Sequence, residues 1–277
     1  MTSAPDRTDR TDRTDRTKLF HALHQPGPLA LPNAWDVASA LIVEAAGAKA
    51  VATTSAGVAW SLGAPDGDAL DRDLAIALVA RIAKAVEIPV TADIESGFGK
   101  DAREVGETAR AVSEAGASGV NIEDSHNHNL RDVREQADRL RAAREAAPDL
   151  FINARTDVYL RGVGEPESRL QHTIDRAQAY LEAGASGIFV PGVTDLETIK
   201  QLAQAIGAPL NVLAGPGAPA VDELATAGAA RISVGTALAS AAYATAKKAA
   251  EELLTKGTYD STSEGLSYGE LNALFNN

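Results

Sequence analysis

Carboxylates follow several of the segments that are typical of β-strands, at the point where each segment ends. Asp93 and Glu95 follow one apolar run, and Glu123 ends the next. Carboxylates held close together repel one another unless a cation neutralises them. A set made only of oxygen ligands favours Mg²⁺ or Mn²⁺, and Mg²⁺ keeps waters that further carboxylates can hold. These three residues predict a divalent-cation site, although a single Asp at a strand end is often a helix cap.

Residues on neighbouring expected strand ends could bind an anion beside the cation. Arg155 offers a planar fork of N–H groups to a substrate carboxylate or phosphonate, with a structural ion pair as the alternative. Thr54, Ser55 and the backbone amides near Gly57 would complete an anion cradle. Two further acids, Asp124 and Asp157, suit helix capping or a structural ion pair better than catalysis.

These residues need a scaffold that brings strand ends together. From Leu29 onward, short β-like runs alternate with longer amphipathic stretches. The expected strands are 29–32, 50–54, 89–93, 119–123, 150–154, 187–191, 209–213 and 230–234. The expected helices are 36–46, 72–86, 102–115, 131–147, 166–183, 196–206, 220–227 and 236–254. This alternation predicts an α/β fold, a single-domain (β/α)8 TIM-type barrel whose active site lies where strands end and loops begin.

An internal repeat supports the barrel. Similar Ala-Gly-Ala segments precede four of the expected strands, with Gly47, Gly116, Gly184 and Gly228 at matching positions. Each copy is typical of a helix end, a glycine turn and the next strand. Chance similarity in a chain rich in Ala and Gly is the alternative, but each copy precedes a strand expected on independent grounds.

Composition excludes several kinds of protein. The 277 residues include no cysteine, so disulfides, thiolate nucleophiles and cysteine metal sites are excluded. The net charge of −12 disfavours a nucleic-acid partner. No apolar run reaches about 18 residues, and the chain opens with polar residues rather than a signal peptide. We therefore expect no membrane partner and a cytoplasmic location.

The N-terminal segment has its own pattern. Residues 6–17 repeat the triplet Asp-Arg-Thr and contain no apolar side chain. Such a segment cannot contribute to a core, so residues 1–18 are expected to be disordered. Residues 19–277 are expected to form the catalytic barrel with a C-terminal helical extension.

Five short motifs, in this order at successive strand ends, resemble the isocitrate lyase/phosphoenolpyruvate mutase superfamily, and the resemblance runs from about Pro32 to the C-terminus. They are Pro32-Asn-Ala-Trp-Asp36, Ser61-Leu-Gly-Ala-Pro-Asp66, Asp93-Ile-Glu-Ser-Gly-Phe-Gly99, Ile122-Glu-Asp124 and Ala154-Arg-Thr-Asp157. The resemblance implies that Asp93 contacts Mg²⁺ and that Glu95 is the second acid of this motif. It also implies that Asp66 and Glu123 are carboxylates that hold metal-bound waters. Thr54, Ser55 and Arg155 would contact the substrate, and Asn211 matches a polar position on strand seven of the family.

The chemistry implied by the resemblance is shared across the superfamily. A 2-oxo acid chelates Mg²⁺, and an enolate is stabilised while a neighbouring C–C or P–C bond breaks or forms. The resemblance also implies a homo-oligomer, a dimer or more commonly a tetramer, in which a C-terminal helix is exchanged between subunits.

The chain departs from the family at its lid. Where the lyases carry a cysteine, this chain has only Ser125-His-Asn-His-Asn129, and it lacks the Lys pair of the phosphonomutases. Gly192 also stands where the lyases have a Glu. His126 or His128 could therefore serve as the proton donor, the alternative being two exposed loop histidines.

Three hypotheses follow. The first is a Mg²⁺-dependent lyase or decarboxylase acting on an oxaloacetate-like or substituted malate-like substrate. The second is P–C bond chemistry on phosphonopyruvate or phosphoenolpyruvate, by a mutase or a hydrolase. The third is a non-catalytic protein that binds 2-oxo acids.

Overall fold

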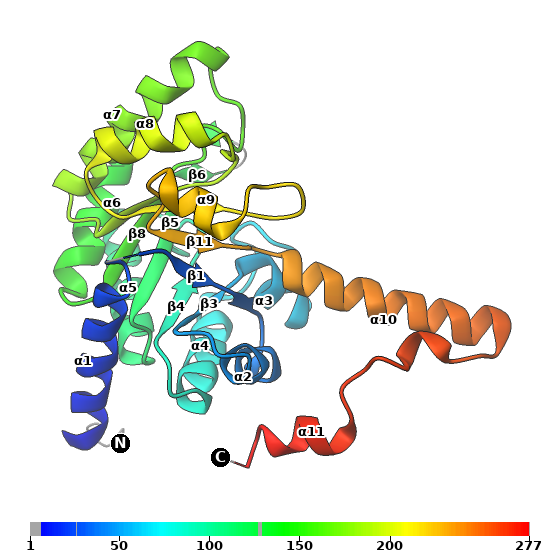
Figure 1. Cartoon of the computed structure of the whole chain (residues 1–277). Coiled ribbons are helices and arrows are strands. Elements are labelled where there is room, and N and C mark those ends of the chain that lie inside the picture. Colours follow the sequence, from blue (N-terminus) through cyan, green and yellow to red (C-terminus); the bar gives the residue numbers. More distant parts are fainter. Residues whose placement is uncertain (1–6, 26, 127–128, 277) are drawn as a thin grey trace.

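Parallel strands form the centre of the molecule, and helices surround them (Figure 1). The computed structural model describes residues 7–25, 27–126 and 129–276. Within these ranges one nine-stranded sheet has the order β1-β11-β10-β9-β8-β5-β4-β3-β2. The single-domain α/β fold of TIM type expected from the sequence is confirmed.

The first expected strand, 29–32, ends at Leu31, and a second short strand follows Pro32. The first, β1 (Leu29–Leu31), pairs with β11 (Arg231–Ser233), and the second, β2 (Asn33–Ala34), pairs with β3 (Val51–Thr53). Proline has no N–H to donate to a strand partner, so the chain changes neighbour there. β1 and β2 are the two outer strands of the sheet, and only Pro32 separates them in the chain, so the barrel is nearly closed.

The remaining elements follow the expected alternation. The other strands of the barrel are β4 (Val90–Asp93), β5 (Gly119–Glu123), β8 (Phe151–Arg155), β9 (Gly187–Val190) and β10 (Leu210–Leu213). The surrounding helices are α2 (Val37–Ala45), α3 (Ser55–Ser61), α4 (Arg72–Ala85), α5 (Ala102–Glu114), α6 (Val133–Ala146), α7 (Arg169–Glu182), α8 (Leu196–Ile206) and α9 (Val221–Thr226). A short hairpin, β6 (Ser125–His126) and β7 (Asn129–Leu130), follows β5.

The glycines of the internal repeat end helices as expected. Gly47, Gly116, Gly184 and Gly228 all have left-handed φ values between 92° and 108°. At Gly228 a Cβ atom would also lie 2.6 Å from the Ala203 Cβ, so both conformation and space require glycine there.

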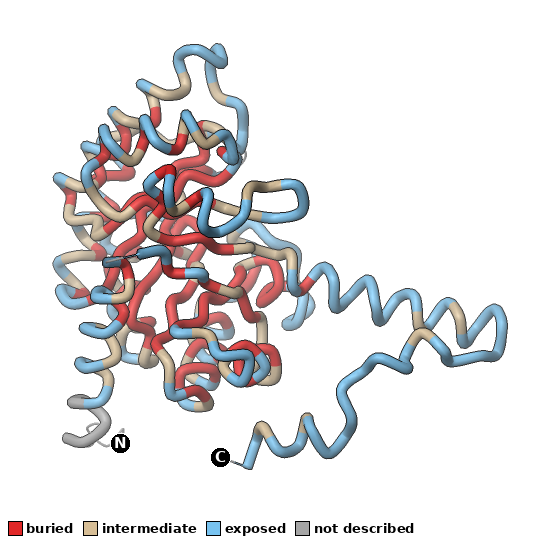
Figure 2. Tube along the Cα trace, viewed as in Figure 1, coloured by how far each residue is buried: buried red, intermediate tan, exposed pale blue. Residues whose placement is uncertain are grey.

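The strands present different side chains to the two sides of the barrel wall. Apolar residues such as Val120, Ile122 and Ile152 pack against the helices and form the main core, which is the buried centre in Figure 2. Alternate residues such as Asn121 and Asn153 lie inside the barrel and bond to each other, Asn153 Nδ2 donating to Asn121 Oδ1 over 2.9 Å. Alternation therefore separates an apolar layer from a polar interior.

The disorder expected for residues 1–18 is wrong for the described part of that segment. Helix α1 spans Arg7–Ala22. Arg16 Nη1 donates to the carbonyl oxygens of Ala83 and Val86 at the end of α4, over 3.2 and 2.8 Å. Arg13 donates to Glu114 O at the end of α5 over 2.8 Å. The repeat therefore gains its order from carbonyls of distant helix ends, which favour cations.

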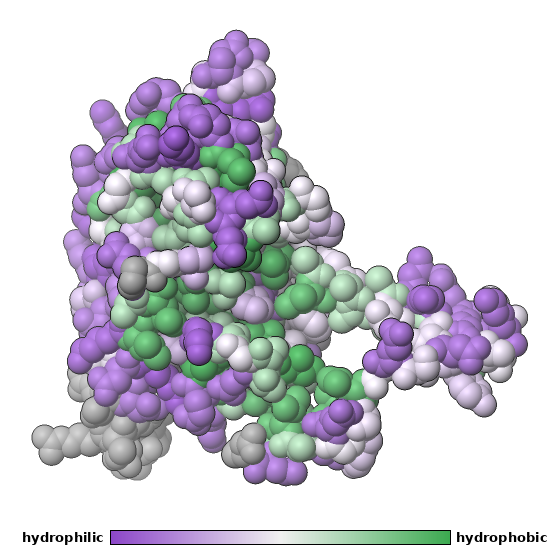
Figure 3. Space-filling view, in the orientation of Figure 1, coloured by the Kyte–Doolittle hydropathy of each residue, from purple (hydrophilic) through white to green (hydrophobic). Residues whose placement is uncertain are grey.

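The C-terminal part of the chain extends away from the barrel. Helix α10 (Ala237–Lys256) projects outward, and the chain returns through α11 (Tyr268–Ala273) (Figure 1). Figure 3 shows weakly apolar residues along the first half of α10 and hydrophilic residues toward its far end. Within the described ranges, no helix is long and apolar enough to cross a membrane.

Candidate active site

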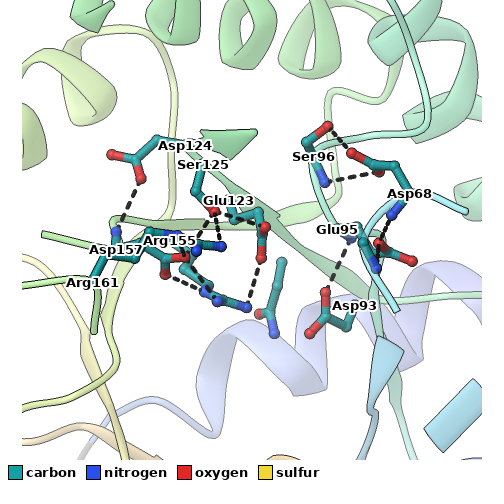
Figure 4. Close-up of polar contacts among 12 residues, drawn as sticks. Asp68, Asp93, Glu95, Ser96, Glu123, Asp124, Ser125, Arg155, Asp157 and Arg161 are labelled. Carbon is teal, nitrogen blue, oxygen red and sulfur yellow. Dashed lines mark hydrogen bonds and ion pairs between the residues drawn. The ribbon is translucent and has the colours of Figure 1, made fainter. Parts of the chain in front are cut away.

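The carboxyl ends of three neighbouring strands, β4, β5 and β8, carry charged residues expected there. Strand pairing sets Asp93 of β4 beside Asn121 of β5, and Glu123 of β5 beside Arg155 of β8. Figure 4 shows these side chains in two groups, one around Asp93 and Glu95 and one around Arg155. The parallel register thus gathers at one mouth residues that are far apart in the sequence.

Asp93 and Glu95 form the acidic group. Asp93 Oδ1 accepts a hydrogen bond from Glu95 N–H over 3.1 Å, and Asp93 N–H donates to Thr53 Oγ1 over 2.9 Å. Glu95 is 3% exposed and has a left-handed φ of 53°. Its carboxylate accepts from the backbone N–H groups of Gly67 and Asp68. The loop that contains Asp66 is thereby held against β4.

Burial makes these carboxylates costly to ionise. It raises the pKa of Asp93, although the charge of Arg155 opposes the shift. Burial also raises the pKa of Glu95 to about 8; the Asp68 N–H opposes this, whereas the charges of Asp68, Asp66 and Asp93 add to it. Asp66 itself is exposed and acts on both groups through its charge. A bound cation would relieve this repulsion.

Arg155 is held by two carboxylates. Its Nη1 lies 2.7 Å from Glu123 Oε2, while Nε and Nη2 donate to Asp157 Oδ1 and Oδ2 over 2.6 and 3.0 Å. A guanidinium group has five N–H donors, so one on Nη1 and one on Nη2 remain for a substrate oxygen. Burial raises the pKa of Glu123 to about 7 against the opposing charge of Arg155.

Asp124 and Asp157, which the sequence indicated as helix caps or members of structural ion pairs, both form ion pairs. Asp157 is fully buried and binds Arg155. Asp124 is also fully buried, 2.9 Å from Arg176 Nη1, and it accepts from the Tyr180 hydroxyl over 2.8 Å. Asp124 Oδ1 in turn accepts from Asp157 N–H over 3.0 Å, so this network fixes the backbone beneath Arg155.

The residues expected to bind an anion lie at the start of α3. Thr54 is the residue before the helix and is buried, and Ser55 begins it. A Cβ atom at Gly57 would lie 2.8 Å from both Thr54 Cγ2 and Trp35 Cβ, so Gly57 permits close packing here. The first turn of a helix leaves N–H groups without intrahelical acceptors, which is compatible with an anion cradle.

Two further expected residues, Asn211 and His126, form no hydrogen bond or ion pair with Asp93, Glu95 or Arg155 within the described part of the chain. Asn211 is buried in β10, where its Oδ1 accepts from Ser233 Oγ over 3.1 Å. Its Nδ2 has no hydrogen-bond partner within the described part of the chain. His126 lies on the hairpin at the mouth, with 46% of its side chain exposed. The other candidate histidine, His128, lies outside the described residues.

Sequence reasoning missed Asp68 and Arg231. Asp68 stands two residues after Asp66, and its carboxylate accepts from Ser96 Oγ over 2.5 Å. Arg231 is buried in β11, and burial lowers its pKa to about 9 against the opposing charge of Asp93. The available signal for Arg231 was that it is the one charged residue of the expected strand 230–234.

The residues present fit a hard cation. Within residues 7–25, 27–126 and 129–276, no three Asp, Glu or His side chains are placed to hold an ion together. Mg²⁺ commonly binds one or two carboxylates directly and keeps its waters, so it does not need such a cluster. Within the described ranges neither Asp93 nor Glu95 forms a salt bridge, and one oxygen of each, Asp93 Oδ1 and Glu95 Oε2, accepts backbone hydrogen bonds. The other oxygen of each carboxylate accepts none there, so it could bind a cation.

Comparison with known proteins agrees with this geometry. The family model described as phosphoenolpyruvate phosphomutase matches residues 20–254. Over 201 residues the chain is 35% identical to 2-methylisocitrate lyase of Escherichia coli, covering 68% of this chain and 66% of that enzyme. Over 220 residues it is 33% identical to oxaloacetate decarboxylase 2 of Pseudomonas fluorescens, covering 76% of this chain and 72% of that enzyme.

A solved structure agrees as well. A candidate lyase or mutase from Burkholderia cenocepacia superposes with a TM-score of 0.89 at 38% identity, covering 96% of this chain and 98% of that one. The match of the family model extends from α1 to α10 and includes every strand of the barrel. The chain therefore belongs to the phosphoenolpyruvate mutase/isocitrate lyase superfamily, whose members are lyases and mutases.

Proposed function

We propose that this protein is a Mg²⁺-dependent lyase or decarboxylase that breaks or forms a C–C bond next to a 2-oxo acid through an enolate. The substrate is an oxaloacetate-like or substituted malate-like acid. The observation that carries the proposal is that two carboxylates, the half-buried Asp93 and the buried Glu95, lie at the same mouth as a fixed guanidinium, Arg155. A cation and an anion-binding fork are the two requirements for holding a 2-oxo acid.

Residues at the mouth of the barrel would have separate roles in binding the cation and the substrate. Asp93 and Glu95 would hold the cation. Asp66 and Glu123, whose charges interact with that of Asp93, would hold its waters. When bound, the cation supplies Lewis-acid chemistry that draws electron density from the carboxylate and carbonyl oxygens of the substrate. Arg155 would bind a substrate oxygen through its two remaining N–H groups, held in orientation by Asp157. Thr54 and Ser55 would bind the substrate carboxylate at the start of α3.

P–C bond chemistry is the second candidate, because the matching family model is the phosphoenolpyruvate phosphomutase family. Both reactions use the same enolate, so the mouth of the barrel alone does not separate them. Phosphorus NMR with phosphonopyruvate and phosphoenolpyruvate separates them from C–C cleavage of oxaloacetate. If binding is intact but neither class of substrate is turned over, the third hypothesis, a 2-oxo-acid binding protein, replaces both.

Calorimetric titration with oxalate, which mimics the enolate of pyruvate, tests the common site. We expect binding with Mg²⁺ and little without it. Asp93→Ala should abolish the Mg²⁺-dependent binding, and Arg155→Ala should weaken it. Absence of binding in both conditions would overturn the proposed enzyme.

We also propose that the protein is a homo-oligomer joined through its C-terminal arm, residues 237–276. Large apolar side chains on this arm are exposed in the single chain, among them Leu254 and Tyr268, each 84% exposed. A projecting helix with exposed apolar residues is stabilised when a second copy covers it.

A further inference from the structure

Asp68 occupies an unusual position at the mouth of the barrel. Among the non-glycine residues that the structure describes, only Asp68, Glu95 and Phe98 have a left-handed φ, at 58°, 53° and 49°. All three belong to the two loops that follow α3 and β4. The left-handed region is unfavourable for Glu95 and Phe98, whereas Asp tolerates it more readily, so the strain lies mainly in the loop after β4.

The carboxylate of Asp68 is fixed by Ser96. Oδ1 accepts from Ser96 N–H over 3.3 Å, and Oδ2 accepts from Ser96 Oγ over 2.5 Å (Figure 4). Ser96 Oγ also accepts from Arg131 Nη2 over 3.3 Å, which directs the hydroxyl proton toward Asp68. The backbone N–H of Asp68 binds Glu95, so this residue joins the acidic group to the loop.

The fixed carboxylate faces the hairpin. Asp68 Oδ2 lies 3.8 Å from His126 Nδ1, and both residues line a pocket of about 420 Å³. Ser96, Phe98, Lys100 and Arg131 are also in its wall. Asp93, Glu95 and Arg155 are not among the described residues that line this pocket; its connection to the acidic group is Asp68, whose N–H donates to Glu95.

We infer that Asp68 is a positioning residue that sets the orientation and tautomer of His126 for proton transfer to the enolate. This inference rests on the proposed function. A carboxylate beside Nδ1 favours the proton on that nitrogen and leaves Nε2 to exchange a proton with the substrate. The carboxylate also stabilises the imidazolium that forms when Nε2 takes a proton.

When the C–C bond breaks, its electron pair becomes part of the enolate. The enolate carbon then forms a C–H bond with the proton of the imidazolium Nε2, and the neutral imidazole regains a proton from water. In the reverse sense, Nε2 removes a methyl proton from pyruvate and gives an enolate, so pyruvate exchanges its methyl protons with D₂O.

The test uses the full-length protein with Mg²⁺ and three readouts. Long-range proton–nitrogen NMR reports the tautomer of His126, assigned by the loss of its signals in His126→Gln. Proton NMR in D₂O reports exchange of the pyruvate methyl group. Oxalate calorimetry reports binding. The main variant is Asp68→Asn, which keeps a side-chain oxygen for Ser96, and the control is Asp73→Asn, an exposed carboxylate that pairs with Arg72.

We expect Asp68→Asn to move the His126 proton away from Nδ1 and to slow exchange at least tenfold, with oxalate affinity within about twofold. His126→Gln should slow exchange as much, and the double variant no further. An unchanged tautomer or exchange rate in Asp68→Asn overturns the inference, as does a wild-type protein that binds oxalate without exchanging pyruvate. If wild type fails to bind oxalate with Mg²⁺, the proposed function fails instead, and the tautomer still decides whether Asp68 positions His126.

Discussion

Arg155 and Asp157 form a two-point contact in the wall of the barrel, with Nε–Oδ1 and Nη2–Oδ2 distances of 2.6 and 3.0 Å. Asp157 is fully buried, and the Arg155 side chain is 15% exposed. Two parallel bonds fix the plane of the guanidinium as well as its position. The orientation of the guanidinium that we propose binds the substrate is therefore set by Asp157, a residue that need not touch the substrate itself.

Asp157→Asn should loosen this fork. Removing one charge of a buried pair leaves Arg155 partly uncompensated, and we expect a loss of about 3 kcal/mol in the free energy of unfolding. Oxalate binding in the presence of Mg²⁺ should weaken as well. Urea unfolding and calorimetry measure the two effects. Asp138→Asn is the matched control, because its pair with Arg141 is exposed and should contribute less than about 1 kcal/mol. Equal effects in the two variants would contradict the role given to Asp157.

Glu95 should make the metal-free protein less stable as pH rises. Its pKa in the folded protein is raised from 4.5 to about 8, so the folded state binds the extra proton between these values. Stability from this group is complete below pH 4.5 and is lost as pH rises through 8, by at most about 5 kcal/mol. Urea unfolding in EDTA across this range should show the slope, and Glu95→Gln should reduce it. A slope that is unchanged in Glu95→Gln would rule out this residue as its source.

The barrel itself follows from short-range patterns in the sequence. The bounds of β5 (Gly119–Glu123) and α8 (Leu196–Ile206) agree with the sequence prediction to the residue. Parallel topology then places strand ends together, so the meeting of Glu123 with Arg155 could be anticipated. Both results depend on periodicity and chain order, which a single sequence contains.

The sequence is less informative where order depends on distant backbone atoms. The Asp-Arg-Thr repeat has no apolar residue, yet Arg16 is ordered by carbonyls about 70 positions away. Asp68 is similar, because its role depends on a left-handed loop that brings it to Ser96. Neither contact leaves a signal in local composition.

Arg16→Ala tests the docking of α1. The side chain is 18% exposed, and its guanidinium caps the last carbonyls of α4. Loss of these charge-assisted bonds should cost about 1–2 kcal/mol in urea unfolding. Lys18→Ala should cost little, since Lys18 is 74% exposed and forms only an exposed pair with Asp15. Unfolding curves that coincide for wild type and Arg16→Ala would show that the Arg16 contacts add nothing to stability, which would leave the buried Phe20 as the contact that holds α1.

His24 should give a pH dependence of the opposite sign to that of Glu95. The ring is buried and stacked on Phe151 with centroids 4.0 Å apart, and its Nδ1–H donates to Phe20 O over 2.8 Å. Burial lowers its pKa from 6.5 to about 4, so the unfolded chain binds the extra proton between these values. Stability from this group is complete above pH 6.5 and falls as pH drops toward 4, by at most about 3 kcal/mol. His24→Phe should flatten that part of the curve, whereas His21→Gln, at an exposed position, should not.

The C-terminal arm should hold copies of the chain together. Leu254 and Tyr268 are each 84% exposed in the single chain, which favours burial against a second copy. Light scattering coupled to size-exclusion chromatography should give a mass that is a multiple of 28.7 kDa. Leu254→Glu should shift the protein toward smaller assemblies by placing a charge in the contact. Leu74→Glu is the matched control, since Leu74 is 52% exposed on α4 and is not part of the arm. A wild-type mass of one chain would contradict the oligomer, and dissociation by Leu74→Glu alone would place the contact on the barrel instead.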